Sequence, residues 1–250
     1  MQASSSPSET AVSCKGLMLR PWEGLILGLA AAAVVCGMIQ AVHPVFRVPK
    51  EFDVPSIGLP TEKFLAHRRE QDRVDSKHAA LYVGGLGFLL AAALAVREAA
   101  ARRSWLPPIV APPLGAAGGA LGGMLGSQVL QYVRVNIGQA DLMHMVGAQL
   151  AVAVPLGLGV GLGLGLATRT AGGIVKTALA GVAAGTLAAV VVPVAVSLLL
   201  PAANTDALLP EEASTRLLWL GLLSGLMGLV IPVAGRRRAS ANAKLSPAQS

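Results

Sequence analysis

Two short units in this sequence place an Asp three positions before a His, and both side chains are metal ligands in many proteins. A carboxylate and an imidazole suit a divalent ion such as Zn²⁺, whose sites usually take three or four protein ligands. If the fold brought the two units together, with His43 nearby, they would form a metal site. The four candidate ligands are Asp75, His78, Asp141 and His144.

An ordinary structural explanation competes with the metal hypothesis, and we favour it. Asp141 directly precedes an apolar segment, and an Asp at the start of a helix caps free N–H groups and suits the helix dipole. Asp75 lies in a stretch rich in charges, where it is one charge on a solvated helix. On this interpretation no cofactor is required.

Three glutamines form a second set of polar side chains within otherwise apolar segments: Gln128, Gln131 and Gln149. Such amides line a wet cavity in some membrane proteins, which would make these residues the vestibule for a small solute. More often they form hydrogen bonds between helices, each contributing about 0.6 kcal/mol. We favour the second interpretation.

Catalytic signatures are absent from the sequence. It contains no HExxH, no GxSxG and no GxxxxGK[ST] phosphate loop. No Asp, Glu, Lys or Arg stands in the middle of an apolar segment, which argues against a proton pump or a voltage sensor. The sequence therefore gives no positive indication of an enzyme.

Six apolar segments must position these residues, and each lacks Asp, Glu, Lys, Arg and His. A helix needs roughly 20 residues to cross a hydrocarbon core of about 30 Å. The segments are apolar on every side, unlike barrel strands, and a helix satisfies its own backbone hydrogen bonds in lipid. We therefore predict an all-α, polytopic transmembrane helix bundle with spans at about 24–42, 79–96, 109–133, 145–168, 177–200 and 217–235.

The composition agrees with a membrane protein and with the lipid bilayer as its solvent. Hydrophobic residues make up 54% of the 250 residues and charged residues only 13%, whereas soluble domains carry about 25% charged residues. The net charge of +7 does not indicate nucleic-acid binding. The basic residues flank apolar segments, and aromatic residues are too few (4%) for a base-stacking platform.

Glycines recur at every fourth position in several of these segments. This spacing places them on one helix face, where two backbones can approach closely and form weak Cα–H···O contacts. We predict close helix packing, with the partner left open between this chain, a second copy and another membrane protein. The first row is Gly115, Gly119 and Gly123; the second is Gly118, Gly122 and Gly126; the third is Gly157, Gly161 and Gly165.

The distribution of Lys and Arg predicts that both termini are cytoplasmic, with the Arg run at 236–238 as the strongest signal. The outer loop at 43–78 is the exception, because it also carries several basic residues. A helix should begin at Thr61 and continue into the second span. Trp219 should mark the interface at the start of the sixth span.

The polar tails, 1–21 and 236–250, are expected to be disordered. Cleavage of the first apolar segment as a signal peptide remains an alternative to its retention as a span. The leading functional hypothesis is a non-enzymatic membrane assembly or interaction component. The alternatives are a permease or channel for a small solute, and a membrane-embedded enzyme or metal protein that uses the outer Asp and His residues. The sequence does not indicate which membrane holds the chain.

Overall fold

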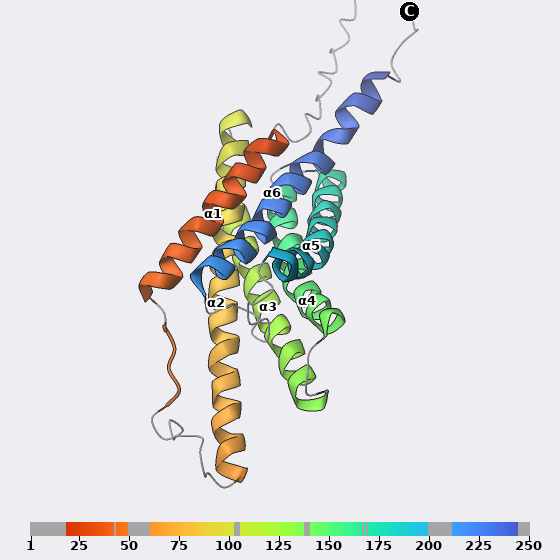
Figure 1. Cartoon of the computed structure of the whole chain (residues 1–250). Helices are drawn as coiled ribbons and strands as arrows, with labels where there is room; N and C mark the ends of the chain where they lie inside the picture. The colour runs from red at the N-terminus through yellow and green to blue at the C-terminus, as the bar shows by residue number, and fades with distance from the viewer. Residues whose placement is uncertain are drawn as a thin grey trace, which may run out of the picture.

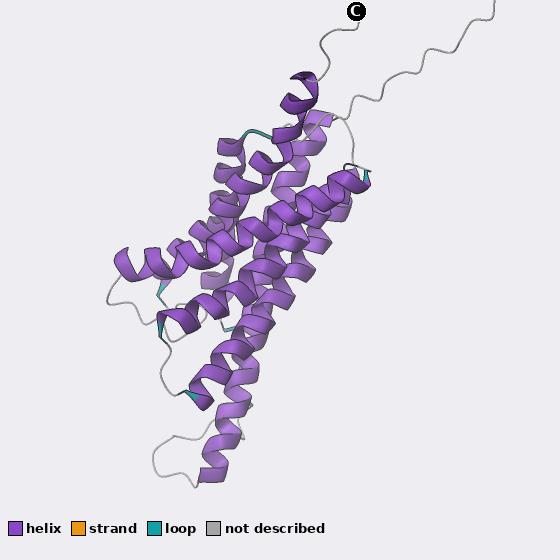
Figure 2. Ribbon diagram, turned by 90° about the vertical axis from the view of Figure 1, so that its right-hand side faces the viewer, coloured by secondary structure: helices purple, strands orange, loops and turns teal. Residues whose placement is uncertain are grey.

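Six α-helices form the regular structure of the residues described by this computed structural model (Figures 1 and 2). It describes 19–42, 44–49, 61–102, 106–137, 141–166, 168, 170–199 and 212–244, without the side chains of 61, 102 and 234–244. Each helix is long and apolar enough to cross a bilayer, so the predicted all-α membrane bundle is confirmed. The helices are α1 (Pro21–Val42), α2 (Thr61–Arg102), α3 (Leu106–Asn136), α4 (Leu142–Leu166), α5 (Ala171–Leu199) and α6 (Ala213–Lys244).

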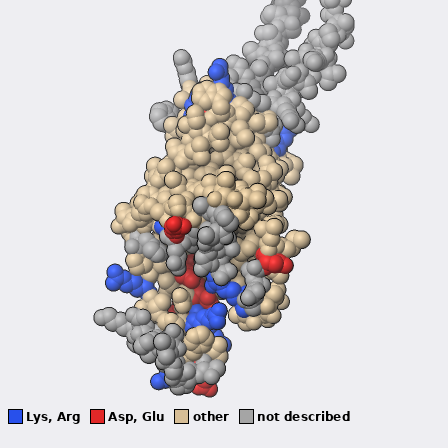
Figure 3. All heavy atoms as spheres, in the orientation of Figure 1, with Lys and Arg blue, Asp and Glu red and all other residues tan. Residues whose placement is uncertain are grey.

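The surface agrees with a membrane-spanning bundle. Figure 3 shows a largely uncharged belt between an upper end with a few Lys and Arg side chains and a lower part where Lys, Arg, Asp and Glu gather on the visible face. Large apolar side chains point outward along the spans; Ile109, Leu121 and Leu179 are all more than half exposed. In water such side chains would favour aggregation, whereas lipid solvates them. The protein is therefore an integral membrane protein.

Helix α2 is much longer than a membrane requires. Its 42 residues correspond to about 63 Å, roughly twice the thickness of the hydrocarbon core. The expected helix from Thr61 does continue into the second span without a break, and in Figure 1 its N-terminal end projects beyond the other helices. We call the exposed, charged part before the span, residues 62–77, the α2 arm.

The C-terminal prediction was wrong in part. The sequence predicted a disordered tail from residue 236, whereas α6 continues as a helix to Lys244. Its last residues contain Arg, Ala and Lys, which have high helix propensity, and neither Gly nor Pro interrupts them after 235. Extending an existing helix also avoids the cost of nucleation. Most of the predicted N-terminal tail lies outside the described residues.

The helix starts show why the segments begin where they do. Pro21 occupies the first position of α1, where its missing N–H costs nothing. Glu23 reaches back to accept a hydrogen bond from the backbone N–H of Arg20 at 3.1 Å. At the start of α5 the Thr170 hydroxyl accepts the N–H of Gly173 at 3.2 Å. These caps satisfy donors that the helix itself leaves unpaired.

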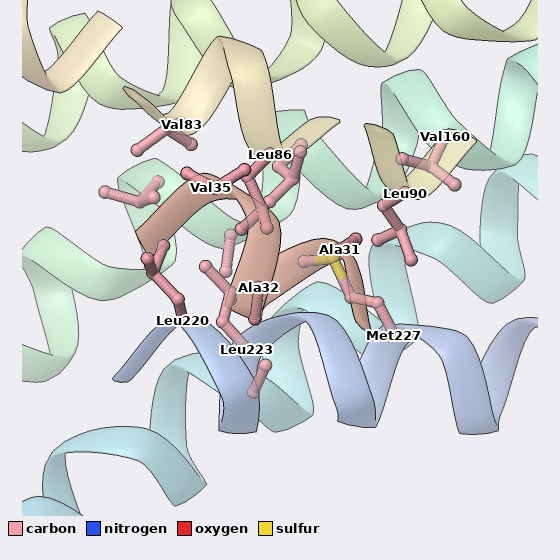
Figure 4. Close-up of a cluster of buried hydrophobic side chains, with 14 of the residues drawn as sticks. Ala31, Ala32, Val35, Val83, Leu86, Leu90, Val160, Leu220, Leu223 and Met227 are labelled. Carbon is pink, nitrogen blue, oxygen red and sulfur yellow. The ribbon is translucent and has the colours of Figure 1, made fainter. Parts of the chain in front are cut away.

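Consecutive helices pack side by side from α2 to α5, while α1 packs on α6 and α2, and α6 packs on α5. Helix α2 also contacts α4 and α6, and α4 contacts α6, so these three helices meet in the interior. Figure 4 shows Leu86 and Leu90 of α2 beside Val160 of α4 and Leu223 and Met227 of α6. All five side chains are completely buried.

The glycine rows lie at contacts between helices of this one chain. A Cβ anywhere in the first row would collide with a main-chain carbonyl of α2, and one at Gly118 or Gly122 of the second row would collide with α4. The third row meets α5 at Gly181, Thr177 and Ile174. Gly126 is buried as well. Only glycine allows these backbones to come so close.

Candidate functional site

The two Asp–His units have different surroundings. His78 is 6% exposed, and its Nε2 accepts a hydrogen bond from the backbone N–H of Phe46 at 2.9 Å. The imidazole stacks on Tyr82, with ring centroids 5.6 Å apart, and a tilted Phe46 ring lies at 5.2 Å. An acceptor at Nε2 requires the neutral ring with its proton on Nδ1. His78 therefore connects the segment after α1 to α2.

Asp141 is the N-cap of α4, as the structural explanation predicted. Its Oδ1 accepts the backbone N–H of His144 at 2.9 Å. The same oxygen lies 2.6 Å from Nδ1 of His144, close enough for an ion pair but not aligned for a hydrogen bond. That backbone hydrogen bond, helped by the charge of His144, holds the pKa of Asp141 below its usual value.

The metal hypothesis gains no support from this arrangement. Among the described residues, no three His, Cys, Asp or Glu side chains come together in a group that could hold a metal ion. Asp75 is exposed on the α2 arm, and His43 lies outside the described residues. The metal site stays a prediction, and the described contacts of His78 and Asp141 are those of structural residues.

The three glutamines also have three different surroundings. Gln128 is exposed on the outside of α3. Gln131 donates a hydrogen bond of 2.9 Å to the main-chain oxygen of Asp72 and so connects α3 to the α2 arm. Gln149 is 3% exposed, and its Oε1 has no hydrogen-bond partner among the described residues. An exposed and a fully buried side chain do not line one open vestibule.

Other polar side chains join helices within the bundle. The Ser127 hydroxyl of α3 lies 2.9 Å from the Ser76 hydroxyl of α2, next to the Gln131 contact. Near the other end, Ser224 of α6 donates to the main-chain oxygen of Gly28 in α1 at 2.8 Å. These bonds place the α2 arm against α3 and fix α1 against α6.

Two residues singled out from the sequence, His78 and Gln149, belong to a group of buried polar side chains near the end of the bundle where α4 and α6 begin, and the burial of the other members was not predicted. We call this group the outer polar cluster; its members are His78, Tyr82, Gln149, Arg216 and Trp219, all less than 10% exposed. Arg216 lies close enough to Tyr82 for its charge to act on the phenol. The indole N–H of Trp219 has no partner within the described part of the chain.

A sequence signal for this cluster did exist, in the spacing of its members. His78 and Tyr82 are four residues apart, and Arg216 and Trp219 three apart, so each pair shares a helix face. Their burial was not predictable, because the predicted sixth span begins only after Arg216, and Trp219 was expected at the membrane interface. Only the contact of α6 with α2 and α4 brings this face of α6 inside.

One carboxylate was missed at the opposite end of the bundle. Glu98 is 2% exposed and is the only buried acid among the described residues. Its neighbour Arg97 forms an ion pair of 3.1 Å with Glu23, which joins α2 to α1. The Arg97 side chain is 41% exposed, so this pair contributes little to stability. Glu98 and Glu23 both lie near the ends of their spans, so the absence of charges in the middle of the spans did not indicate them.

No protein-family model, curated protein or solved structure matches this chain. Function must therefore be argued from the residues and their geometry.

Proposed function

We propose that this chain is a non-enzymatic assembly or interaction component of a membrane, with both termini on the cytoplasmic side and the α2 arm on the other. The observation that supports this proposal is the rigid continuation of α2 beyond its span. Residues 62–77 correspond to about 24 Å of helix. A folded projection of that length presents a fixed surface to a protein on the outer side.

The contacts of the α2 arm support a fixed orientation. Gln131 binds the main chain of Asp72, and Ser127 binds Ser76, so the end of α3 supports one side of the arm. On the same helix face, one to two turns toward the N-terminus, exposed residues follow, among them Leu65 at 48% exposure and the charged Arg69. An exposed leucine among charges is typical of a contact surface with an apolar centre and a polar rim.

The proposed orientation follows from the charges at the two ends of the bundle. Arg97 and Lys176 share an end with the Arg run at 236–238, which corresponds to the cytoplasmic side under the positive-inside rule. The basic residues of the α2 arm are an exception, but they alternate with Glu and Asp along a folded helix. The short connections carry most weight in this rule.

A photo-crosslinking residue at position 65 tests the proposed function. In living cells we expect a discrete protein adduct from the crosslinker at position 65. The adduct should no longer form when Arg69→Glu is introduced into the same chain. Position 121 is the matched control, because Leu121 is also exposed (58%) but lies within a span and faces lipid. Absence of a discrete adduct at position 65, or the same adduct at position 121, would refute the proposal.

A permease for a small solute is the second candidate, and one observation favours it. Gln149 and Trp219 each bury a polar atom without a partner among the described residues. Buried polar groups in proteins are nearly always hydrogen-bonded, so an unpaired one calls for an explanation such as a bound molecule. Flux of urea into proteoliposomes, measured with and without the protein, distinguishes this candidate from a purely structural component.

A further inference from the structure

We propose that Gln149 and Trp219 form a buried site for one small neutral molecule that carries both a hydrogen-bond donor and an acceptor, such as a primary amide. The Gln149 Oε1 is an acceptor and the Trp219 Nε1–H is a donor, and both side chains are 3% exposed. This inference does not depend on the proposed assembly function, since a site of this kind is compatible with either role.

The position of Gln149 on α4 directs it toward the centre of the bundle. The α3 side of α4 is occupied by Val152 and Pro155, and the α5 side by Ala153 and Gly157. Gln149 lies between these two sides, on the face it shares with Leu156, seven residues later, and with Val160. That face meets α2, because the Leu156 side chain packs at Gly87.

The depth of Gln149 follows from the same contact. Helices α2 and α4 both contact α3 in antiparallel register, so they run in the same direction. Gly87 lies level with Leu156. Gln149 lies two turns before Leu156 on α4, about 10 Å nearer the outer end. It is therefore level with the stretch of α2 that precedes Tyr82.

Trp219 reaches a similar depth from α6. Leu223 belongs to the buried cluster that also holds Leu86 of α2 (Figure 4). One turn toward the outer end lie Trp219 on α6 and Tyr82 on α2. Long side chains on a helix lean toward its N-terminus, which directs the indole of Trp219 further outward. Helices α4 and α6 are themselves in contact, and from these depths we infer that the two unpaired groups lie in one layer of the core.

The chemistry of the two groups selects a neutral ligand. The partial negative charge of the Gln149 Oε1 would repel an anion, and the partial positive charge of the Trp219 N–H would repel a cation. A charged ligand of either sign is therefore disfavoured by one of the two groups. A molecule with an N–H or O–H and a separate oxygen satisfies both. His78, held by the Phe46 N–H, lies one turn before Tyr82 on α2.

Acrylamide is a suitable probe, because it is a primary amide and also quenches tryptophan fluorescence. The full chain with Trp22→Phe and Trp105→Phe keeps Trp219 as its only tryptophan. We expect saturable quenching of Trp219 by acrylamide and none by iodide. Gln149→Leu should raise the acrylamide concentration that gives half-maximal quenching by at least about tenfold, which corresponds to the loss of one good hydrogen bond. Gln128→Leu, which alters an exposed glutamine, should leave it unchanged.

Gln149→Met is the second variant in case Gln149→Leu does not fold, since Met keeps the length of the side chain without the amide. Quenching that rises linearly with acrylamide, or saturable quenching that survives both substitutions, would overturn the proposed site. Either result leaves the crosslinking test of the α2 arm unaffected, so failure of this inference is distinct from failure of the proposed function.

Discussion

Gly157 of α4 and Gly181 of α5 lie so close together that a Cβ added to either would collide with the main-chain carbonyl of the other. The contact is therefore between backbones, with no side chain in between. The same reciprocal arrangement joins Gly87 to Gly115 and Gly24 to Gly228. Contacts of this kind are stiff, because no rotamer change relieves an added methyl group.

Substitution of Gly157 by Ala should therefore destabilise the protein by about 1–3 kcal/mol, the usual cost of overpacking. Gly147→Ala is the matched control in the same helix, since a Cβ there meets nothing within 4 Å. It should be neutral or slightly stabilising, because Ala has the higher helix propensity. Unfolding in mixed detergent micelles measures both variants, and equal stability would show that the α4–α5 contact is not so close.

Helix α1 should be present in the mature protein rather than removed as a signal peptide. A Cβ at Gly24 or Gly28 would collide with the main chain of α6, so α1 packs directly against it. The Ser224 hydroxyl also donates a hydrogen bond of 2.8 Å to the Gly28 carbonyl. Loss of α1 would expose the buried α6 face around Ser224. The intact mass of the purified protein should include residues 21–42; a mass that lacks them would contradict this packing.

His78→Ala should release the segment after α1 from α2. The Phe46 N–H would lose its acceptor, at a cost of about 1 kcal/mol, which corresponds to roughly fivefold faster exchange of that amide. Hydrogen exchange followed by mass spectrometry measures the peptide that contains Phe46. His144→Ala is the control, because it interacts with Asp141 instead. Unchanged exchange at Phe46 would show that the bond to His78 contributes nothing.

Asp141 should make stability depend on pH in the acid range. Its pKa in the folded protein lies below the usual value, so its contribution is present above about pH 4 and is lost as the pH falls through the lower, folded pKa. Asp141→Asn keeps a good N-cap but cannot titrate, and its stability should vary less with pH in that range. Parallel pH profiles for wild type and variant would contradict this assignment.

The spans were predictable from sequence because lipid imposes a simple rule of length and apolarity, and α1 to α6 obey it. The faces of the glycine rows were predictable from helical period alone, but not their partners, which depend on how the helices pack. Three buried polar side chains lie near the ends of spans: Arg216, Trp219 and Glu98. At these positions the sequence does not distinguish a polar side chain in water from one buried in the bundle. The end of α6 was mispredicted because a polar composition suits a helix as well as a disordered tail.

In the proposed function, α2 crosses the membrane with its arm outside the cytoplasm. Cysteine labelling of this one helix tests that claim, in a chain with Cys14→Ser, where Cys36 is buried. A membrane-impermeant maleimide should label Arg69→Cys in intact cells and Ala100→Cys, exposed near the other end of α2, only after permeabilisation. Labelling of both positions in intact cells, or the reverse pattern, would contradict the account.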